Sequence, residues 1–254
     1  MEKNGYVRTE IANDVCTITF FHPQSNSLPG TLLRQLAATI EDCGRNNSNK
    51  VIVLKSEGEK AFCAGASFDE LVSIDSFEKG KEFFSGFASV INAMRETTQF
   101  IIARVQGKAV GGGVGIASAA DYVFAHRSAS VKLSELAVGI GPFVVGPAVE
   151  RKIGKSAFSA LTINCSEWYS SSWALQNGLF NEYFDTHEAL DNAVNNFALK
   201  LSNYNPEAMK MLKKIFWEGT DHWNMLLNER AELSGKLVLS DFTKKAISDF
   251  KKKK

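Results

Sequence analysis

FIIARVQGKAVGGGVG, residues 100–115, joins an apolar run to a cluster of glycines. Phe100 to Gln106 is rich in apolar and β-branched residues, which predicts a strand. The residues that follow, Gly107 to Gly115, are rich in glycine, and the small residues after them predict a helix up to Ala120. Exposed backbone amides at the start of a helix favour negative charge. The stretch therefore predicts a strand, a tight loop and a helix, with a place for developing negative charge between them.

Glycine-rich turns of this kind also occur in dinucleotide-binding proteins, where they follow the pattern GxGxxG. A pattern that starts at Gly111 requires glycine at position 116, where this chain has Ile116. A pattern that starts at Gly113 requires glycine at position 118, which is Ser118. Neither register fits, so a dinucleotide site is not expected. Ser118, which lies near the glycines, also suggests a serine hydrolase of a related spiral fold, but no histidine follows at a recognisable position. The glycines could also serve only close helix packing.

The alternation of strands and helices extends on both sides of this stretch. Further strands are predicted over 15–21, 51–55, 121–125 and 131–133, and helices from Thr31 and over 76–96. Such alternation is typical of an α/β core with parallel strands. After Gly146 the pattern becomes mostly helical, with helices predicted over 205–217, 223–239 and 241–250. The final residues, Lys251 to Lys254, are expected to form a frayed, solvated tail.

Composition and charge exclude several classes of protein. The chain has 254 residues and a formal net charge of +1, which argues against nucleic-acid binding through phosphate neutralisation. Residues 1–10 are polar and no apolar run reaches membrane-spanning length, so we expect a cytoplasmic protein without a membrane partner. The four cysteines are widely spaced and lack a CxxC pair, which predicts thiols and no disulfide framework or zinc site. The four histidines show no metal-ligand spacing, so no metal is expected.

Two further segments carry candidate chemistry. Ala61 to Ser67, AFCAGAS, consists largely of small residues that let a ligand approach the backbone. Glu135 follows a predicted strand and precedes the turn at Gly141 and Pro142. Taken singly, the first segment also fits a structural turn, and Glu135 also fits a surface or capping glutamate.

Together, the three segments resemble the crotonase (enoyl-CoA hydratase/isomerase) superfamily. That family has a loop of the form F-C-A-G-A-D, a glycine-rich turn before a helix, and an acidic residue further along. The matching positions here are Phe62–Ser67, Gly111–Gly113 and Glu135. The resemblance extends to the turn at His22, Pro23 and Asn26, to SSSWALQNGLFNEYF over 170–184, and to Asn205–Ala208. It thus covers nearly the whole chain.

The resemblance implies an α/β spiral of ββα turns over residues 1–195 and a C-terminal helical region over 196–254 that drives trimerisation. The expected assembly is a homotrimer or a dimer of trimers. The implied substrate is an acyl-CoA thioester, with coenzyme A as part of the substrate and no separate cofactor. The amides of Ala64 and Gly112 would form an oxyanion hole, and Phe62 and Ala64 would contact the adenine through their backbone. The implied substrate-binding residues are Phe62, Ala64, Gly65, Ala66, Gly111, Gly112 and Phe143.

One departure from the family bears on the reaction. Hydratases of this superfamily use two glutamates, and at the first of these positions the chain has Gly115. A single carboxylate, Glu135, suffices to move a proton from C2 to C4 of a 3-enoyl thioester, and the pattern is closest to single-glutamate Δ3,Δ2-enoyl-CoA isomerases. Phe143 stands in a segment where hydratases tend to have P-G-x-G-G, and we expect it to help exclude water. A second departure is Ser67, where the family usually has aspartate.

Three alternatives remain open. The first is a hydratase or dehydratase with an unusual second acid/base, Asp69 or Glu70. The second is a thioester decarboxylase, which needs an oxyanion hole but no base at Glu135. The third is a protein that binds acyl-CoA or acyl-carrier protein, or acts as a trimeric scaffold, without catalysis. Neither the acyl chain length nor the choice between coenzyme A and a carrier protein follows from the sequence.

Overall fold

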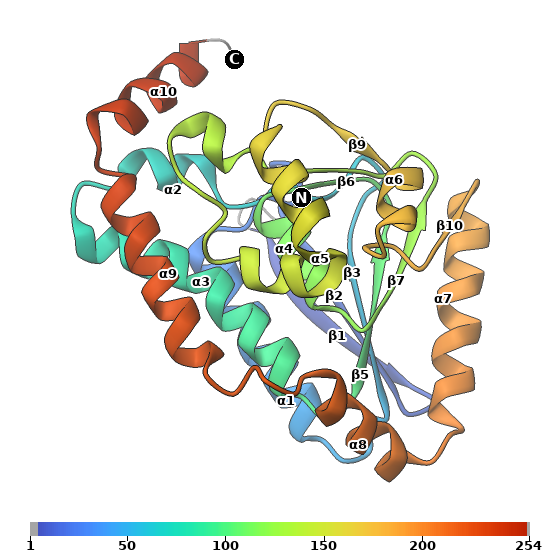
Figure 1. Cartoon of the computed structure of the whole chain (residues 1–254). Helices are drawn as coiled ribbons and strands as arrows, with labels where there is room; N and C mark the ends of the chain where they lie inside the picture. Colours follow the sequence, from blue (N-terminus) through green and yellow to red (C-terminus); the bar gives the residue numbers. More distant parts are fainter. Residues whose placement is uncertain (1–4, 253–254) are drawn as a thin grey trace.

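The computed structural model describes residues 5–252, and the side chains up to residue 249 (Figure 1). Its strands are β1 (Tyr6–Ala12), β2 (Val15–Phe21), β3 (Val51–Ser56), β4 (Ala61–Cys63), β5 (Phe100–Val105), β6 (Lys108–Val110), β7 (Tyr122–His126), β8 (Ser130–Lys132), β9 (Tyr169–Ser170) and β10 (Glu182–Phe184). Its helices are α1 (Gly30–Arg45), α2 (Phe68–Ser73), α3 (Phe77–Glu96), α4 (Gly112–Ala119), the 3-10 helix η1 (Glu135–Val138), α5 (Gly146–Ile163), α6 (Ser171–Gln176), α7 (His187–Ser202), α8 (Pro206–Phe216), α9 (Trp223–Leu237) and α10 (Asp241–Lys252).

The larger sheet has the strand order β1-β2-β3-β5-β7-β10 and is parallel except where β1 pairs with β2. Its central strands are apolar on both faces because both faces are covered. In β3, Val51 and Val53 pack toward α7, whereas Ile52 and Leu54 belong to the main core on the other face. This alternation places α7 on the side of the sheet opposite α1 and α3 (Figure 1).

The smaller sheet has the order β4-β6-β8-β9. Successive turns of the chain contribute one strand to each sheet: β3 and β4, then β5 and β6, then β7 and β8. Because β4, β6 and β8 run parallel, their carboxyl ends lie at one edge of the smaller sheet. The predicted α/β spiral is therefore confirmed, and Ala64, Gly111 and Glu135 come within three residues after the ends of these three strands.

Some predicted boundaries were wrong. The polar N-terminal residues form strand β1, which pairs with β2 from Tyr6 to Ala12 and leaves most of its side chains exposed. The segment Ala61–Ser67 was predicted as a loop, but its first three residues form β4, buried between neighbouring elements. At its end Ser67 caps α2, since its hydroxyl accepts a hydrogen bond from the amide of Glu70. The small residues of this segment masked the strand.

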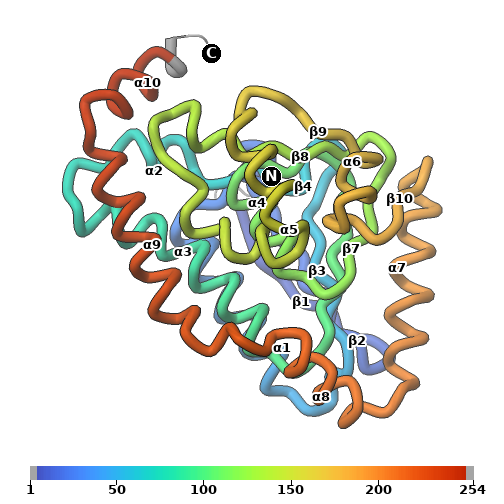
Figure 2. Tube along the Cα trace, in the orientation of Figure 1, coloured from blue at the N-terminus to red at the C-terminus, as the bar shows by residue number. Residues whose placement is uncertain are grey.

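The C-terminal region is helical, as predicted. Helix α9 lies along α3 (Figure 2), and the two backbones meet closely at a glycine pair. An ideal Cβ on Gly80 would lie 3.0 Å from the Cα of Gly235. Helix α7 runs across residue 195, where the sequence suggested a division, and that division remains a prediction. Helix α10 includes Lys251 and Lys252, and the rest of the predicted tail lies outside the described residues. None of the described helices is long and apolar enough to cross a bilayer.

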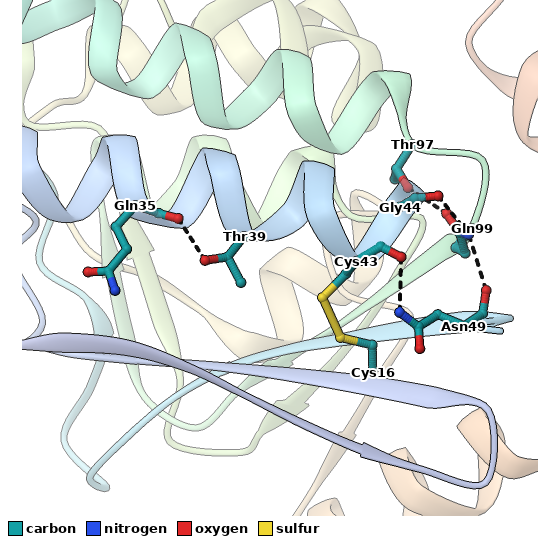
Figure 3. Close-up of a disulfide and its surroundings, with 8 residues drawn as sticks. All are labelled: Cys16, Gln35, Thr39, Cys43, Gly44, Asn49, Thr97 and Gln99. Atoms are coloured by element: carbon teal, nitrogen blue, oxygen red, sulfur yellow. Dashed lines mark hydrogen bonds between the residues drawn. A yellow bond between two sulfur atoms is a disulfide. The ribbon is translucent and has the colours of Figure 1, made fainter. Parts of the chain in front are cut away.

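One prediction about the cysteines was wrong. The structure joins Cys16 on β2 to Cys43 on α1 in a disulfide, with their Cα atoms 6.6 Å apart (Figure 3). Both residues lie in the main core between the sheet and the helix. Cys63 and Cys165 are free. A sequence separation of 27 residues carries no pairing signal, because only the packing of α1 on β2 brings these two side chains together.

Candidate active site

A cavity of about 940 Å³ opens at the edge where β4, β6 and β8 end. Seven of the eight predicted site residues line it: Ala64, Gly65, Ala66, Gly111, Gly112, Glu135 and Phe143. Phe62 is not among the described lining residues. Its side chain is fully buried and packs edge-on against Phe20, with ring centroids 5.5 Å apart. The spiral thus brings together three segments that are far apart in the sequence.

The loops after β4 and β6 touch at two glycines. Gly65 has φ +89°, and an ideal Cβ there would lie 3.0 Å from the carbonyl oxygen of Val110 and 3.7 Å from the amide nitrogen of Gly112. Gly111 also has a positive φ, +53°, and its amide donates to the carbonyl of Lys132 at the end of β8. Only glycine combines these backbone conformations with such close approach. The glycines therefore hold the three loops together.

The two amides predicted to form the oxyanion hole both belong to residues in the cavity wall, but they differ in their partners. The Gly112 amide, at the first position of α4, is not hydrogen-bonded to any residue that the structure describes. The Ala64 amide donates to the carbonyl oxygen of Ser25 at 3.2 Å. Ser25 lines the same cavity. A substrate oxygen that binds the Ala64 amide must therefore share this donor with Ser25 or displace the Ser25 carbonyl.

The loop that carries Ser25 is held by Asn26. Both residues are non-glycine residues with φ 55°, a conformation that needs support from the surrounding structure. The buried Asn26 amide group donates to the carbonyls of Glu57 (2.8 Å) and Ala61 (2.9 Å), and its oxygen accepts from the amide of His22 (2.9 Å). Asn26 thus fixes the first loop against β4, which places Ser25 beside Ala64.

Glu135 is the first residue of η1, and its carboxyl group lies against Gly111. An ideal Cβ on Gly111 would lie 2.9 Å from Oε1 of Glu135, so any larger residue there would displace the carboxyl group. Oε2 is buried and has no hydrogen-bond partner among the described residues. Burial raises the pKa of the Glu135 carboxyl from an ordinary 4.5 to about 7. A carboxyl with one unpaired oxygen and such a pKa, placed in a cavity, is suited to accept and return a proton near neutral pH.

The position of the missing first glutamate is filled by another side chain. Gly115 is fully enclosed in α4, and an ideal Cβ there would lie 2.5 Å from Cγ1 of Val145. Val145 is buried and also lines the cavity. The wall near Gly115 is therefore aliphatic, with no space for a second acid without rearrangement of Val145.

The two other acids considered from the sequence have different surroundings. Glu70 is not among the described lining residues, and its Oε2 accepts from the amide of Gly30 at the start of α1 at 2.8 Å. Asp69 lines the cavity, is exposed, and accepts from Nε2 of Gln24 at 3.0 Å. Glu70 thus supports α1, whereas Asp69 is available to the cavity.

Sequence reasoning missed much of the apolar wall. Phe83, Phe84 and Phe87 on α3 line the cavity, as do Ala246 and Asp249 on α10. The three phenylalanines lie close together in the sequence, at a spacing that can present them on one side of a helix, but that pattern also describes an ordinary core helix. Among the described residues, no group of three His, Cys, Asp or Glu side chains is arranged to hold a metal ion.

Comparison with known proteins agrees with this geometry. The sequence profile of the family described as "Enoyl-CoA hydratase/isomerase" matches residues 10–254. The bacillaene synthase dehydratase PksH of Bacillus subtilis is 28% identical over 85% of this chain and 82% of its own length. The short-chain-enoyl-CoA hydratase of Clostridium acetobutylicum is 27% identical over 86% of this chain and 83% of its own length.

The fold is also similar to that of a solved structure. The crystal structure of enoyl-CoA hydratase from Bacillus halodurans superposes with a TM-score of 0.89 and 25% identity, covering 96% of this chain and 99% of that one. The family profile spans all three segments that form the cavity, as well as the helices after them. The chain belongs to the enoyl-CoA hydratase/isomerase family of the crotonase superfamily.

Proposed function

We propose that the protein is a Δ3,Δ2-enoyl-CoA isomerase with Glu135 as its single acid/base. The observation that carries this proposal is the buried carboxyl of Glu135, whose Oε2 has no hydrogen-bond partner among the described residues, in a cavity lined by Val145, the side chain that packs on Gly115. Moving a double bond requires one group that removes a proton and returns it. Adding water also requires a group that holds and activates the water, and the Gly115 position supplies none.

The proposed reaction balances without a co-reactant. Ionised Glu135 removes a proton from C2 of a 3-enoyl thioester, and the electron pair moves onto the thioester oxygen as a dienolate. The amides of Ala64 and Gly112 donate to that oxygen, and each such donor contributes about 3–4 kcal/mol to transition-state stabilisation in related acyl chemistry. Protonated Glu135 then returns the proton at C4, which restores the carbonyl and leaves the double bond between C2 and C3.

The apolar part of the cavity wall supports a reaction without water. Phe143 and Val145 line the cavity on the side that follows η1, and Phe83, Phe84 and Phe87 line it from α3. Apolar walls disfavour an ordered water, which needs two or more polar partners. Burial also raises the pKa of Glu135, as expected for a carboxyl that is shielded from water.

A second candidate function is hydration or dehydration with Asp69 as the additional acid/base. Asp69 is favoured over Glu70 because it lines the cavity, whereas Glu70 is engaged with the start of α1. Two relatives, named above as a dehydratase and a hydratase, support this as the runner-up. Decarboxylation needs no base at Glu135 and therefore leaves the buried carboxyl without a role. Binding of acyl-CoA without catalysis does the same.

The test compares two substrates on wild type, Glu135→Gln and Asp69→Asn. With 3-hexenoyl-CoA, we expect wild type to form conjugated 2-enoyl-CoA, and Glu135→Gln to lose about 10²–10⁴-fold in kcat while Asp69→Asn stays active. With 2-hexenoyl-CoA, we expect no loss of conjugated absorbance. Equal isomerisation by wild type and Glu135→Gln would reject Glu135 as the base. Water addition that disappears in Asp69→Asn would support the second candidate instead.

We also propose a homotrimer or a dimer of trimers. Several large apolar side chains of α8 and α9 are exposed, among them Met211 (65%), Ile215 (53%) and Met225 (64%). Exposed large apolar residues on two helices that follow one another support a surface that a second copy covers.

A further inference from the structure

Helix α10, the last element of the chain, is part of the cavity wall. Ala246 and Asp249 line the cavity. Ile247, one position after Ala246, is 7% exposed and belongs to a small apolar cluster. The other members of that cluster lie on or just after α2, α3, η1 and α9, among them Phe68, Leu71, Phe84 and Val138. The packing of α10 thus encloses one side of the cavity.

Helix α10 also rests on the turn that ends η1. The hydroxyl of Thr243 donates to the carbonyl of Gly139 at 3.3 Å. Gly139 has φ +81°, and an ideal Cβ there would lie 2.5 Å from Oγ1 of Thr243 and 2.6 Å from Cδ1 of Phe242. The contact leaves no space between the helix and the turn. The position of α10 relative to Glu135, at the other end of η1, is therefore set by direct packing.

The lining near α10 is suited to an alkyl chain. Phe68, Leu71, Phe84, Val138 and Ile140 all line the cavity and all belong to, or pack on, the same apolar cluster as Ile247. In Figure 1, α10 lies beyond α2 and α9, on the side of the molecule away from the larger sheet. An acyl chain that starts at the oxyanion amides and passes Glu135 would enter this apolar part of the cavity.

We propose that α10 closes the acyl end of the site and that Ala246 sets the longest acyl chain the enzyme accepts. This proposal rests on the acyl-CoA function proposed above. Ala246 is the small side chain at which α10 meets the cavity, whereas its neighbour Ile247 is occupied in the cluster. A larger residue at 246 fills the end of the cavity without removing any group that touches the thioester.

The test measures binding of saturated acyl-CoA thioesters, from butyryl to dodecanoyl, by calorimetry. These ligands lack the double bond, so the result does not depend on which reaction the enzyme catalyses. Each buried methylene tightens binding by about fourfold, so affinity should rise with chain length up to a break where the cavity is full. We expect Ala246→Phe to move this break to a shorter chain by about two carbons, with butyryl-CoA affinity unchanged.

Two further variants keep the test decisive. Lys245→Ala changes an exposed residue on the same helix and should leave the break where it is in wild type. If circular dichroism shows that Ala246→Phe is unfolded, the milder substitution Ala246→Leu replaces it. Ala246→Leu should shift the break in the same direction. An identical break in wild type and a folded Ala246 variant overturns the proposal, as does an affinity that does not change with chain length. If Ala246 variants change the preferred acyl chain length in binding but wild type does not convert 3-hexenoyl-CoA, this proposal stands and the isomerase function is rejected.

Discussion

Replacing Glu135 with glutamine should stabilise the protein at neutral pH while removing its activity. In the folded state burial raises the pKa of Glu135 from 4.5 to about 7. A carboxyl whose folded pKa lies above its unfolded value binds its proton more tightly in the folded state. It therefore favours folding when protonated, and this advantage is lost as the pH rises from the unfolded pKa through the folded one. Glutamine is uncharged at every pH and avoids this loss.

The size of the effect follows from the shift. A change from 4.5 to about 7 corresponds to about 3 kcal/mol, at about 1.4 kcal/mol per pKa unit. The free energy of unfolding of Glu135→Gln should thus equal that of wild type near pH 4 and exceed it by about 3 kcal/mol above pH 7. The difference should develop between about pH 4.5 and 7.

Urea unfolding followed by circular dichroism, at a series of pH values from 4 to 8.5, measures this difference. Glu229→Gln serves as the matched control for the loss of one carboxylate because Glu229 is exposed on α9. The isomerisation rate of wild type should rise with pH through the same interval, since the base must be ionised. A stability difference that is flat with pH for Glu135→Gln would show that this carboxyl is solvated, and the reasoning about its role would fail.

Three further predictions follow from particular contacts. Gly115→Ala should lower the free energy of unfolding by about 1–3 kcal/mol despite the helix preference of alanine, because the new Cβ overlaps Val145. Adding Val145→Ala to this variant should restore most of the lost stability. Additive effects of the two substitutions in urea unfolding would contradict the contact. Wild type should show a mass near three or six times 27.9 kDa by light scattering, and Ile215→Glu should reduce it; a wild-type monomer would reject the assembly. In urea without reductant, thiol titration should find two reactive cysteines, and after reduction it should find four. Four reactive cysteines under both conditions would show that Cys16 and Cys43 are not joined.

The sequence was informative where local chemistry dictates local structure. Strand β2 was predicted over the same residues that the structure shows, because a run of β-branched and aromatic side chains suits a half-buried or buried strand. Strand β1 was missed because it lies at the sheet edge with most of its side chains exposed, and polar residues there resemble a loop. Strand β4 was missed because its three residues are stabilised by pairing with β6, which a local pattern does not report.

The candidate site could be assembled only in part. Motif order predicted that residues 64, 112 and 135 belong together, and all three line one cavity. The hydrogen bond from the Ala64 amide to Ser25, the filling of the Gly115 position by Val145, and the contribution of α10 were not predictable. Each of these contacts joins elements whose relative position depends on the whole packed structure.

Residue type and order along the chain were enough to predict the α/β class, the family pattern and the lack of a second glutamate at position 115. Only the packed fold shows that Oε2 of Glu135 has no described hydrogen-bond partner, that the pKa of Glu135 is raised, that Cys16 meets Cys43, and that the last helix lines the cavity. The physical reason is that desolvation, space and proximity are properties of neighbours in three dimensions, and these neighbours come from turns of the spiral that are distant in sequence.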